Sequence, residues 1–226
     1  MSAKAILFVH GAFHGSWCWD AVVAGLTTHG IPCRSIELYR GGLAADVAAI
    51  RAEIDALAAE GHSVVVVGHS LGCASLSSLT PERIAHAVFL AGPIVGPGLP
   101  PIAECTTPDF TAALTISENR SMEVDLELAR DLFYHDCSAA QVKDAIPRLR
   151  PNQNYGPKPP EGTPLYERVP STYLWCDDDR VVHPKYQRQL AEHTRYSEGF
   201  ATSHSPMLSA PDELVAALLR VLERTE

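Results

Sequence analysis

The 226-residue chain is 46% hydrophobic and 20% charged, which is the composition of an ordinary soluble globular protein. Its formal net charge of −9 argues against nucleic acid or an anionic membrane surface as a partner. No segment reaches the ~18 to 20 apolar residues of a membrane helix, and the apolar stretch near the N-terminus is too short for a signal peptide. These features predict one large cytoplasmic α/β domain with an insertion.

Short apolar runs alternate with helical patterns over the first 92 residues. Residues 5–11, 33–39, 64–67 and 86–92 are predicted as buried strands. Residues 16–29, 43–57 and 71 to about 79 are predicted as helices, the second because apolar residues recur in it at spacings of three and four. This alternation predicts a parallel sheet covered by helices on both faces.

The alternation of strands and helices stops near Gly92 and resumes near residue 171. Between them, residues 105–165 predict short helices, such as 122–136, interrupted by the Pro- and Gly-rich stretch 151–162. Strands at 171–176 and 195–201 then alternate with helices at 184–193 and about 212–223. The middle part is therefore predicted to be an insertion into one α/β domain.

The motif GHSLG, residues 68–72, lies where a buried strand ends and a helix begins. That context is typical of a nucleophile elbow, in which a serine hydroxyl is exposed on a tight turn between two glycines. The tripeptide GHS also occurs at residues 61–63, but there Val65 replaces the second glycine and the strand follows instead of preceding. Ligands bind at the carboxyl ends of strands in α/β sheets, so Ser70 is the predicted nucleophile and Ser63 is not.

A serine nucleophile needs a base and an acid that orients it, in the chain order serine, acid, histidine. Asp177, Asp178 and Asp179 follow the strand at 171–176, and their spacing alone does not separate them. Of the histidines downstream, His204 lies in the loop between the last strand and the last helix, where the base is expected. The predicted oxyanion hole consists of the Leu71 N–H and the Ala12 N–H, the second in the loop after the first strand.

The segments HGAFHGSWCWD, GHSLG, DDDRVVHPKYQ and SHSPM together resemble the α/β-hydrolase superfamily over essentially the whole chain. More narrowly, the chain resembles the small branch that holds plant methyl-ester esterases, hydroxynitrile lyases and their bacterial relatives. In that branch the acid lies seven residues before the aromatic of an aromatic-Gln pair. Here the pair is Tyr186-Gln187, so the resemblance implies Asp179 as the acid and Asp177 as the fallback.

The resemblance also implies a domain division and a reaction class. Residues 1–96 and 166–226 would form the α/β-hydrolase core, and residues 97–165 a small helical cap inserted after the fourth strand. Residues from the first loop and the cap could line the substrate pocket: Phe13, Phe133, Tyr134 and Leu149. The lyase members carry threonine and lysine where this chain has Gly11 and Ser205, which favours the esterase side.

We therefore expect a serine carboxylesterase for small-molecule esters that needs no metal or cofactor and is a monomer or homodimer. The alternatives are another reaction of the same triad (amide, lactone, carbon–carbon or cyanohydrin cleavage) and a receptor-like ligand-binding protein. The six cysteines have no ligand spacing, which predicts buried free thiols.

Overall fold

The computed structural model describes residues 3–38, 41–153 and 162–225. Six strands form one parallel sheet in the order β2-β1-β3-β4-β8-β9. Their bounds are β1 Ala3–Val9, β2 Cys33–Ile36, β3 His62–His69, β4 Ile84–Leu90, β8 Ser171–Cys176 and β9 Tyr196–Phe200. The predicted parallel sheet is thus confirmed, although the last residue of the predicted strand 33–39 lies outside the described residues.

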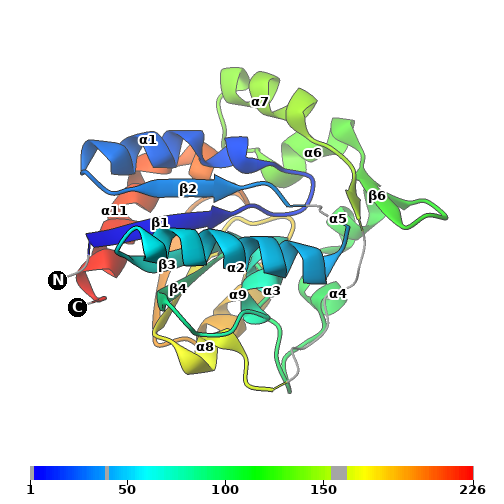
Figure 1. Cartoon of the computed structure of the whole chain (residues 1–226). Coiled ribbons are helices and arrows are strands. Elements are labelled where there is room, and N and C mark those ends of the chain that lie inside the picture. The colour runs from blue at the N-terminus through cyan, green and yellow to red at the C-terminus, as the bar shows by residue number, and fades with distance from the viewer. Residues whose placement is uncertain (1–2, 39–40, 154–161, 226) are drawn as a thin grey trace.

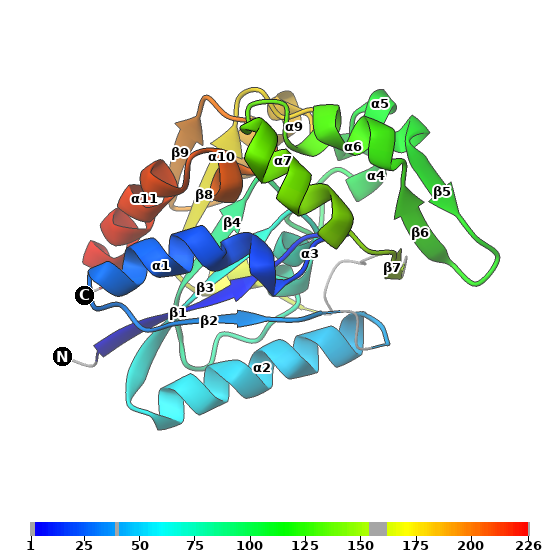
Figure 2. The ribbon, with the colours of Figure 1, turned by 90° about the horizontal axis from the view of Figure 1, so that it is seen from above.

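Helices cover both faces of this sheet, as the buried central strands require. One face is covered by α1 (Asp20–Thr28), α10 (Pro206–Ser209) and α11 (Pro211–Glu223), and the 3₁₀ helix η1 (Ser16–Trp19) precedes α1. The other face is covered by α2 (Leu43–Ala59), α3 (Leu71–Ser77) and α9 (Pro184–Ala191). Figure 2 shows the sheet between α1 and α11 on one side and α2 on the other.

Alternate residues of each strand face the two helix layers. Leu7 and Val66 belong to the apolar cluster on the α2 side, whereas Phe8 and Val67 belong to the cluster on the α1 and α11 side. All four side chains are completely buried. Because successive residues of a strand point to opposite faces, a run such as VVVV contributes to both cores at once.

Apart from α8 (Leu165–Arg168), the described part of the segment between β4 and β8 lies beside the carboxyl ends of the central strands, where β1 and β2 point in Figure 1. Its helices are α4 (Ile102–Cys105), α5 (Pro108–Ala112), α6 (Leu126–Phe133), α7 (Ala139–Ala145), η2 (Ile146–Arg148) and α8 (Leu165–Arg168). It also contains an antiparallel sheet of β5 (Leu114–Ile116), β6 (Ser121–Val124) and β7 (Asn152–Gln153).

This small sheet corrects the expectation of helices alone in the segment. Residues 122–136 were expected to be helical, but the helix begins only at Leu126, after the N-cap Asp125, whose side chain accepts a hydrogen bond from the Glu127 N–H. Residues 121–124 pair instead with β5 across a turn that holds Arg120 at a φ of 65°. Most of the Pro- and Gly-rich stretch 151–162 lies outside the described residues.

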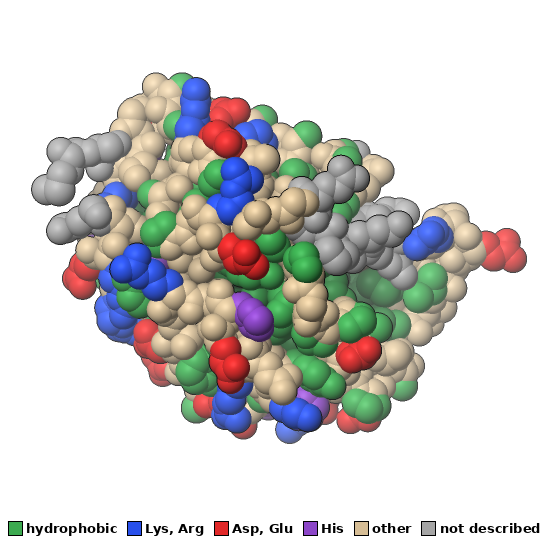
Figure 3. All heavy atoms as spheres, turned by 90° about the horizontal axis from the view of Figure 1, so that it is seen from below, with side chains coloured by type: hydrophobic (Ala, Val, Ile, Leu, Met, Phe, Trp, Pro, Cys, Tyr) green, Lys and Arg blue, Asp and Glu red, His purple; other side chains and the backbone are tan. Residues whose placement is uncertain are grey.

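Acidic and basic side chains are scattered among one another over the face seen in Figure 3, and hydrophobic side chains gather near its middle. The net charge of −9 therefore forms no continuous acidic field on that face. Among the described residues, no helix is long and apolar enough to cross a membrane.

Candidate active site

The turn between β3 and α3 carries Ser70 in a strained conformation. Its φ of 50° and ψ of −120° lie where non-glycine residues are rarely found. The Ser70 N–H donates to the Leu90 carbonyl of the neighbouring strand at 3.0 Å, which anchors the turn. A Cβ at Gly72 would lie 2.7 Å from the Val9 carbonyl oxygen, so only glycine lets α3 approach the end of β1 this closely.

The other GHS serine lies at the opposite end of the same strand. Ser63 pairs in register with Lys4, near the start of β1, whereas Ser70 follows the last residue of β3. The two serines are therefore separated by nearly the full length of β3, and only Ser70 lies at the carboxyl edge of the sheet.

A buried pair of side chains lies at this same edge. The Nδ1 of His204 is 2.7 Å from the Oδ2 of Asp179, and both side chains are almost completely buried. The Asp179 Oδ1 accepts hydrogen bonds from the Val181 and Val182 N–H groups at 2.7 and 3.0 Å. Because Nδ1–H donates to the carboxylate, Nε2 is the nitrogen of His204 that can accept a proton.

The structure separates the three consecutive aspartates by burial. Asp177 and Asp178 are exposed, whereas Asp179 is 4% exposed. Asp177 accepts from the Trp175 Nε1–H at 3.0 Å and pairs with Arg188. Of the three, Asp179 is thus the one that the structure brings to His204.

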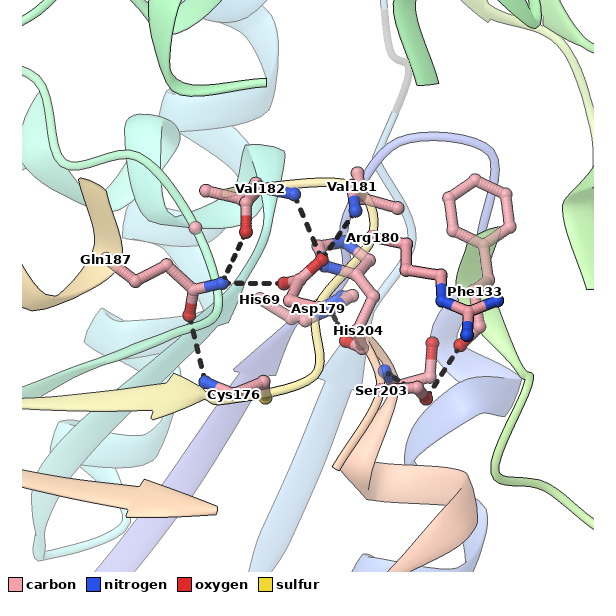
Figure 4. Close-up of polar contacts among 12 residues, drawn as sticks. His69, Phe133, Cys176, Asp179, Arg180, Val181, Val182, Gln187, Ser203 and His204 are labelled. Carbon is pink, nitrogen blue, oxygen red and sulfur yellow. Dashed lines mark hydrogen bonds and ion pairs between the residues drawn. The ribbon is translucent and has the colours of Figure 1, made fainter. Parts of the chain in front are cut away.

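Gln187 contacts the same carboxylate oxygen of Asp179 as His204 does, and Figure 4 shows its amide pointing toward Asp179. Its Nε2 donates to the Asp179 Oδ2 and to the Val182 carbonyl, each at 2.7 Å, and its Oε1 accepts from the Cys176 N–H at 3.0 Å. In the sequence, Gln187 belongs to the aromatic-Gln pair that marks the acid, but no role of its own was predicted for it. A polar residue on the buried face of the helix at 184–191 was the available signal.

His69, next to Ser70 in sequence, contacts His204 through the main chain. Its Nε2–H donates to the His204 carbonyl at 2.8 Å, and the two rings lie 4.6 Å apart. Burial lowers the pKa of His69 well below its ordinary value, so its imidazole is neutral. His69 therefore fixes the loop that carries His204 relative to the elbow.

The loop after β1 passes directly over the elbow. A Cβ at Gly11 would lie 2.7 Å from the Ser70 Cβ, which shows how closely the two backbones approach. Ala12 follows in this loop, and Leu71 is the first residue of α3. The N–H of a first helical residue has no partner within the helix, so that of Leu71 is available to a ligand.

A cluster of aromatic rings contacts His204 through Phe133, on the side of the inserted segment. Phe13, Phe110 and Phe133 form a triangle with ring centroids 6.0 to 6.4 Å apart, and the Phe133 ring lies 6.0 Å from that of His204. Phe110 was not anticipated. A second link to this segment is the Ser203 hydroxyl, which donates to the Phe133 carbonyl at 3.0 Å (Figure 4).

The remaining two residues predicted to line a pocket lie in different surroundings. Tyr134 is completely buried, and its hydroxyl is 2.6 Å from the Nε2 of His14. Leu149 is half-buried and packs against the core cluster on the α2 side.

The described residues include no group of three or more His, Cys, Asp or Glu side chains that could hold a metal ion. All six cysteines are free thiols, but only four are buried. Cys33 and Cys137 are half-buried, which corrects the expectation that all would be buried.

Comparisons with known proteins identify the family and several relatives of the chain. The model of the "Alpha/beta hydrolase family" matches residues 6–217. Probable esterase PIR7A of Oryza sativa is 31% identical over 96% of this chain and 96% of its own length, and a pyrethroid hydrolase of Sphingobium wenxiniae is 28% identical over 96% and 87%. Among solved structures, tomato methylketone synthase I with 2-tridecanone superposes with a TM-score of 0.84 at 19% identity, covering all of both chains.

Proposed function

The chain belongs to the α/β-hydrolase family, in a branch whose members include a methylesterase of Arabidopsis thaliana that is 27% identical to it. From this premise we propose that it is a serine carboxylesterase for small esters. The observation that carries the proposal is the buried hydrogen bond between His204 and Asp179, at the same sheet edge as the strained Ser70. Its relatives include a probable esterase and a pyrethroid hydrolase, which supports ester hydrolysis.

In the proposed first step, His204 Nε2 takes the proton of the Ser70 hydroxyl as its oxygen attacks the ester carbonyl. The imidazolium that forms is stabilised by the Asp179 carboxylate, which its other hydrogen bonds keep in place. The negative charge on the carbonyl oxygen is met by the N–H groups of Ala12 and Leu71.

Collapse of this tetrahedral intermediate releases the alcohol, which takes its proton from His204 and leaves an acyl group on Ser70. Water then attacks the acyl-enzyme with His204 again acting as the base. As this second tetrahedral intermediate collapses, the bond between the acyl group and Ser70 breaks, the Ser70 oxygen takes the proton from His204, and the carboxylic acid leaves. Residues 97–165 would form a cap over the site, since the described helices from α4 to α7 lie beside the carboxyl ends of the strands, and this cap would contribute Phe133 to the wall of the site.

The test compares the two GHS serines. Ser70→Ala is expected to abolish p-nitrophenyl acetate turnover and covalent labelling by a fluorophosphonate probe, because it removes the nucleophile. Ser63→Ala is the matched control, since the same change at the other end of β3 is expected to leave both signals unchanged. If Ser70→Ala labels like the wild type, the assignment is wrong. A wild type that the probe labels but that turns over no ester, and that keeps a stable acyl adduct, would favour a binding role instead.

A further inference from the structure

Two buried imidazoles hold consecutive peptide groups of the loop after β1. The Nδ1–H of His10 donates to the Gly11 carbonyl at 2.8 Å, and the Nδ1–H of His14 donates to the Ala12 carbonyl at 2.9 Å. Both histidine side chains are almost completely buried. The orientation of the peptide groups on either side of the Ala12 Cα is thus determined by side-chain hydrogen bonds.

The second nitrogen of each imidazole is held by a donor from a distant segment. The Leu38 N–H donates to His10 Nε2 at 3.1 Å, and the Tyr134 hydroxyl donates to His14 Nε2 at 2.6 Å. Burial lowers the pKa of His10 to about 4 and that of His14 to about 3. Both imidazoles are therefore neutral near neutral pH, with the proton on Nδ1, which is the tautomer these contacts require.

The inserted segment contributes a further bond to the same loop. The Arg150 N–H donates to the Phe13 carbonyl at 2.9 Å, where Phe13 has a φ of 65° that costs a non-glycine residue conformational energy. Tyr134 and Arg150 both lie in the segment between β4 and β8. Two of the contacts that shape the loop therefore come from outside the core that carries Ser70.

These contacts determine where the Ala12 N–H points. The peptide between Gly11 and Ala12 is trans, so its N–H points away from the carbonyl that His10 holds. Gly11 lies against Ser70, since a Cβ added at Gly11 would be 2.7 Å from the Ser70 Cβ. An N–H on the opposite side of this peptide from His10 is in the position to meet an oxyanion formed at Ser70.

Resting on the proposed esterase function, we propose that His10 and His14 act as a clamp that positions the Ala12 N–H for the tetrahedral oxyanion, and that the Tyr134 hydroxyl holds this clamp from the inserted segment. His10, His14 and Tyr134 are positioning residues, since they act through the backbone of the loop. The segment at 97–165 thereby contributes to catalysis as well as to the wall of the site.

Tyr134→Phe tests the clamp by removing one hydroxyl. We expect kcat for p-nitrophenyl acetate to fall roughly 10- to 100-fold, which is less than the 10²- to 10³-fold loss for deleting an oxyanion donor outright. KM is expected to stay within about twofold, because the contact acts on the transition state. The affinity for an aryl trifluoromethyl ketone, which forms a tetrahedral adduct with a serine nucleophile, should fall in parallel with kcat.

Thr172→Val is the matched control. The Thr172 hydroxyl is 2.8 Å from the Nε2 of buried His86, so the variant also loses one buried contact between a hydroxyl and an imidazole. This pair lies toward the amino ends of β4 and β8, away from Ser70. Thr172→Val should lose stability comparably in urea denaturation but keep kcat and the inhibitor affinity within about twofold.

A second variant, His14→Phe, keeps a ring in place but removes both hydrogen bonds, and its kcat is expected to fall at least as far as that of Tyr134→Phe. Unchanged kcat and inhibitor affinity in the folded variants, beside an active wild type, would overturn the clamp alone. Equal losses of kcat in Thr172→Val and Tyr134→Phe would assign Tyr134 a purely structural role. A wild type that neither hydrolyses an ester nor binds the ketone would overturn the proposed function and the clamp with it.

Discussion

Lowering the pH from 6.5 to 5.5 tests how the folded chain keeps its buried histidines. His10, His14, His69 and His86 have 0 to 1% of their surface exposed. Burial lowers the pKa of His10 and His86 from 6.5 to about 4, that of His14 to about 3, and that of His69 well below 6.5. All four are therefore neutral in the native state across this interval.

The unfolded chain binds protons at these histidines as the pH falls through 6.5, while the folded chain does not. Their contribution to stability is thus complete above pH 6.5 and is lost as the pH falls toward their native pKa values. Integration from pH 6.5 to 5.5 gives about 1 kcal/mol for each histidine, or about 4 kcal/mol for four. That is a large part of the roughly 5 to 15 kcal/mol that stabilises a typical domain.

Urea denaturation at pH 6.5 and 5.5, followed by tryptophan fluorescence at constant ionic strength, measures this loss. His86→Gln is the informative variant, because His86 lies away from Ser70 and glutamine can still bond to Thr172. It should reduce the loss between the two pH values by about 1 kcal/mol. A wild type whose unfolding free energy changes by less than about 1 kcal/mol would show that these histidines are not held neutral by burial.

Two further predictions concern the acid and the elbow. Asp179→Asn should lower kcat by about 10³- to 10⁴-fold, because the amide cannot stabilise an imidazolium. The kcat of Asp177→Asn, at an exposed position, should stay within about twofold of the wild type. Equal kcat losses in steady-state assays would contradict the choice of acid. Gly72→Ala should lower the free energy of unfolding by about 1 to 3 kcal/mol, since the new Cβ would lie 2.7 Å from the Val9 carbonyl oxygen. Unchanged stability in urea would show that α3 can move away from β1 at little cost.

Much of the fold was predictable from local pattern. The apolar runs and the helical periodicity are local properties of the chain, and the parallel sheet and its helix layers follow from their alternation. The small sheet of β5, β6 and β7 was missed because it has no such local pattern. Its strands are two to four residues long, too short to show a period, and β7 is contributed from 28 positions beyond the end of β6 (152 − 124).

The candidate site divides in the same way. Ser70 was predictable because the motif and its position between strand and helix are contiguous in sequence, and His204 because the order of elements restricts the base to a loop. The choice of acid needed either a family resemblance or tertiary burial, since Asp177, Asp178 and Asp179 are equivalent by spacing. No role was predicted for Gln187, because only the folded structure reveals that its amide faces a carboxylate.

The sequence by itself indicated the strands and helices of the large sheet, their order and the predicted position of the nucleophile, because each depends on residues within about one helical turn or strand of one another. Only the tertiary structure decided which distant groups hold the residues of the candidate site in place. Tyr134 reaches His14 across 120 positions, and His69 reaches the His204 carbonyl across 135. Such contacts leave no local pattern, since they arise where buried polar groups from distant segments must satisfy one another's hydrogen bonds.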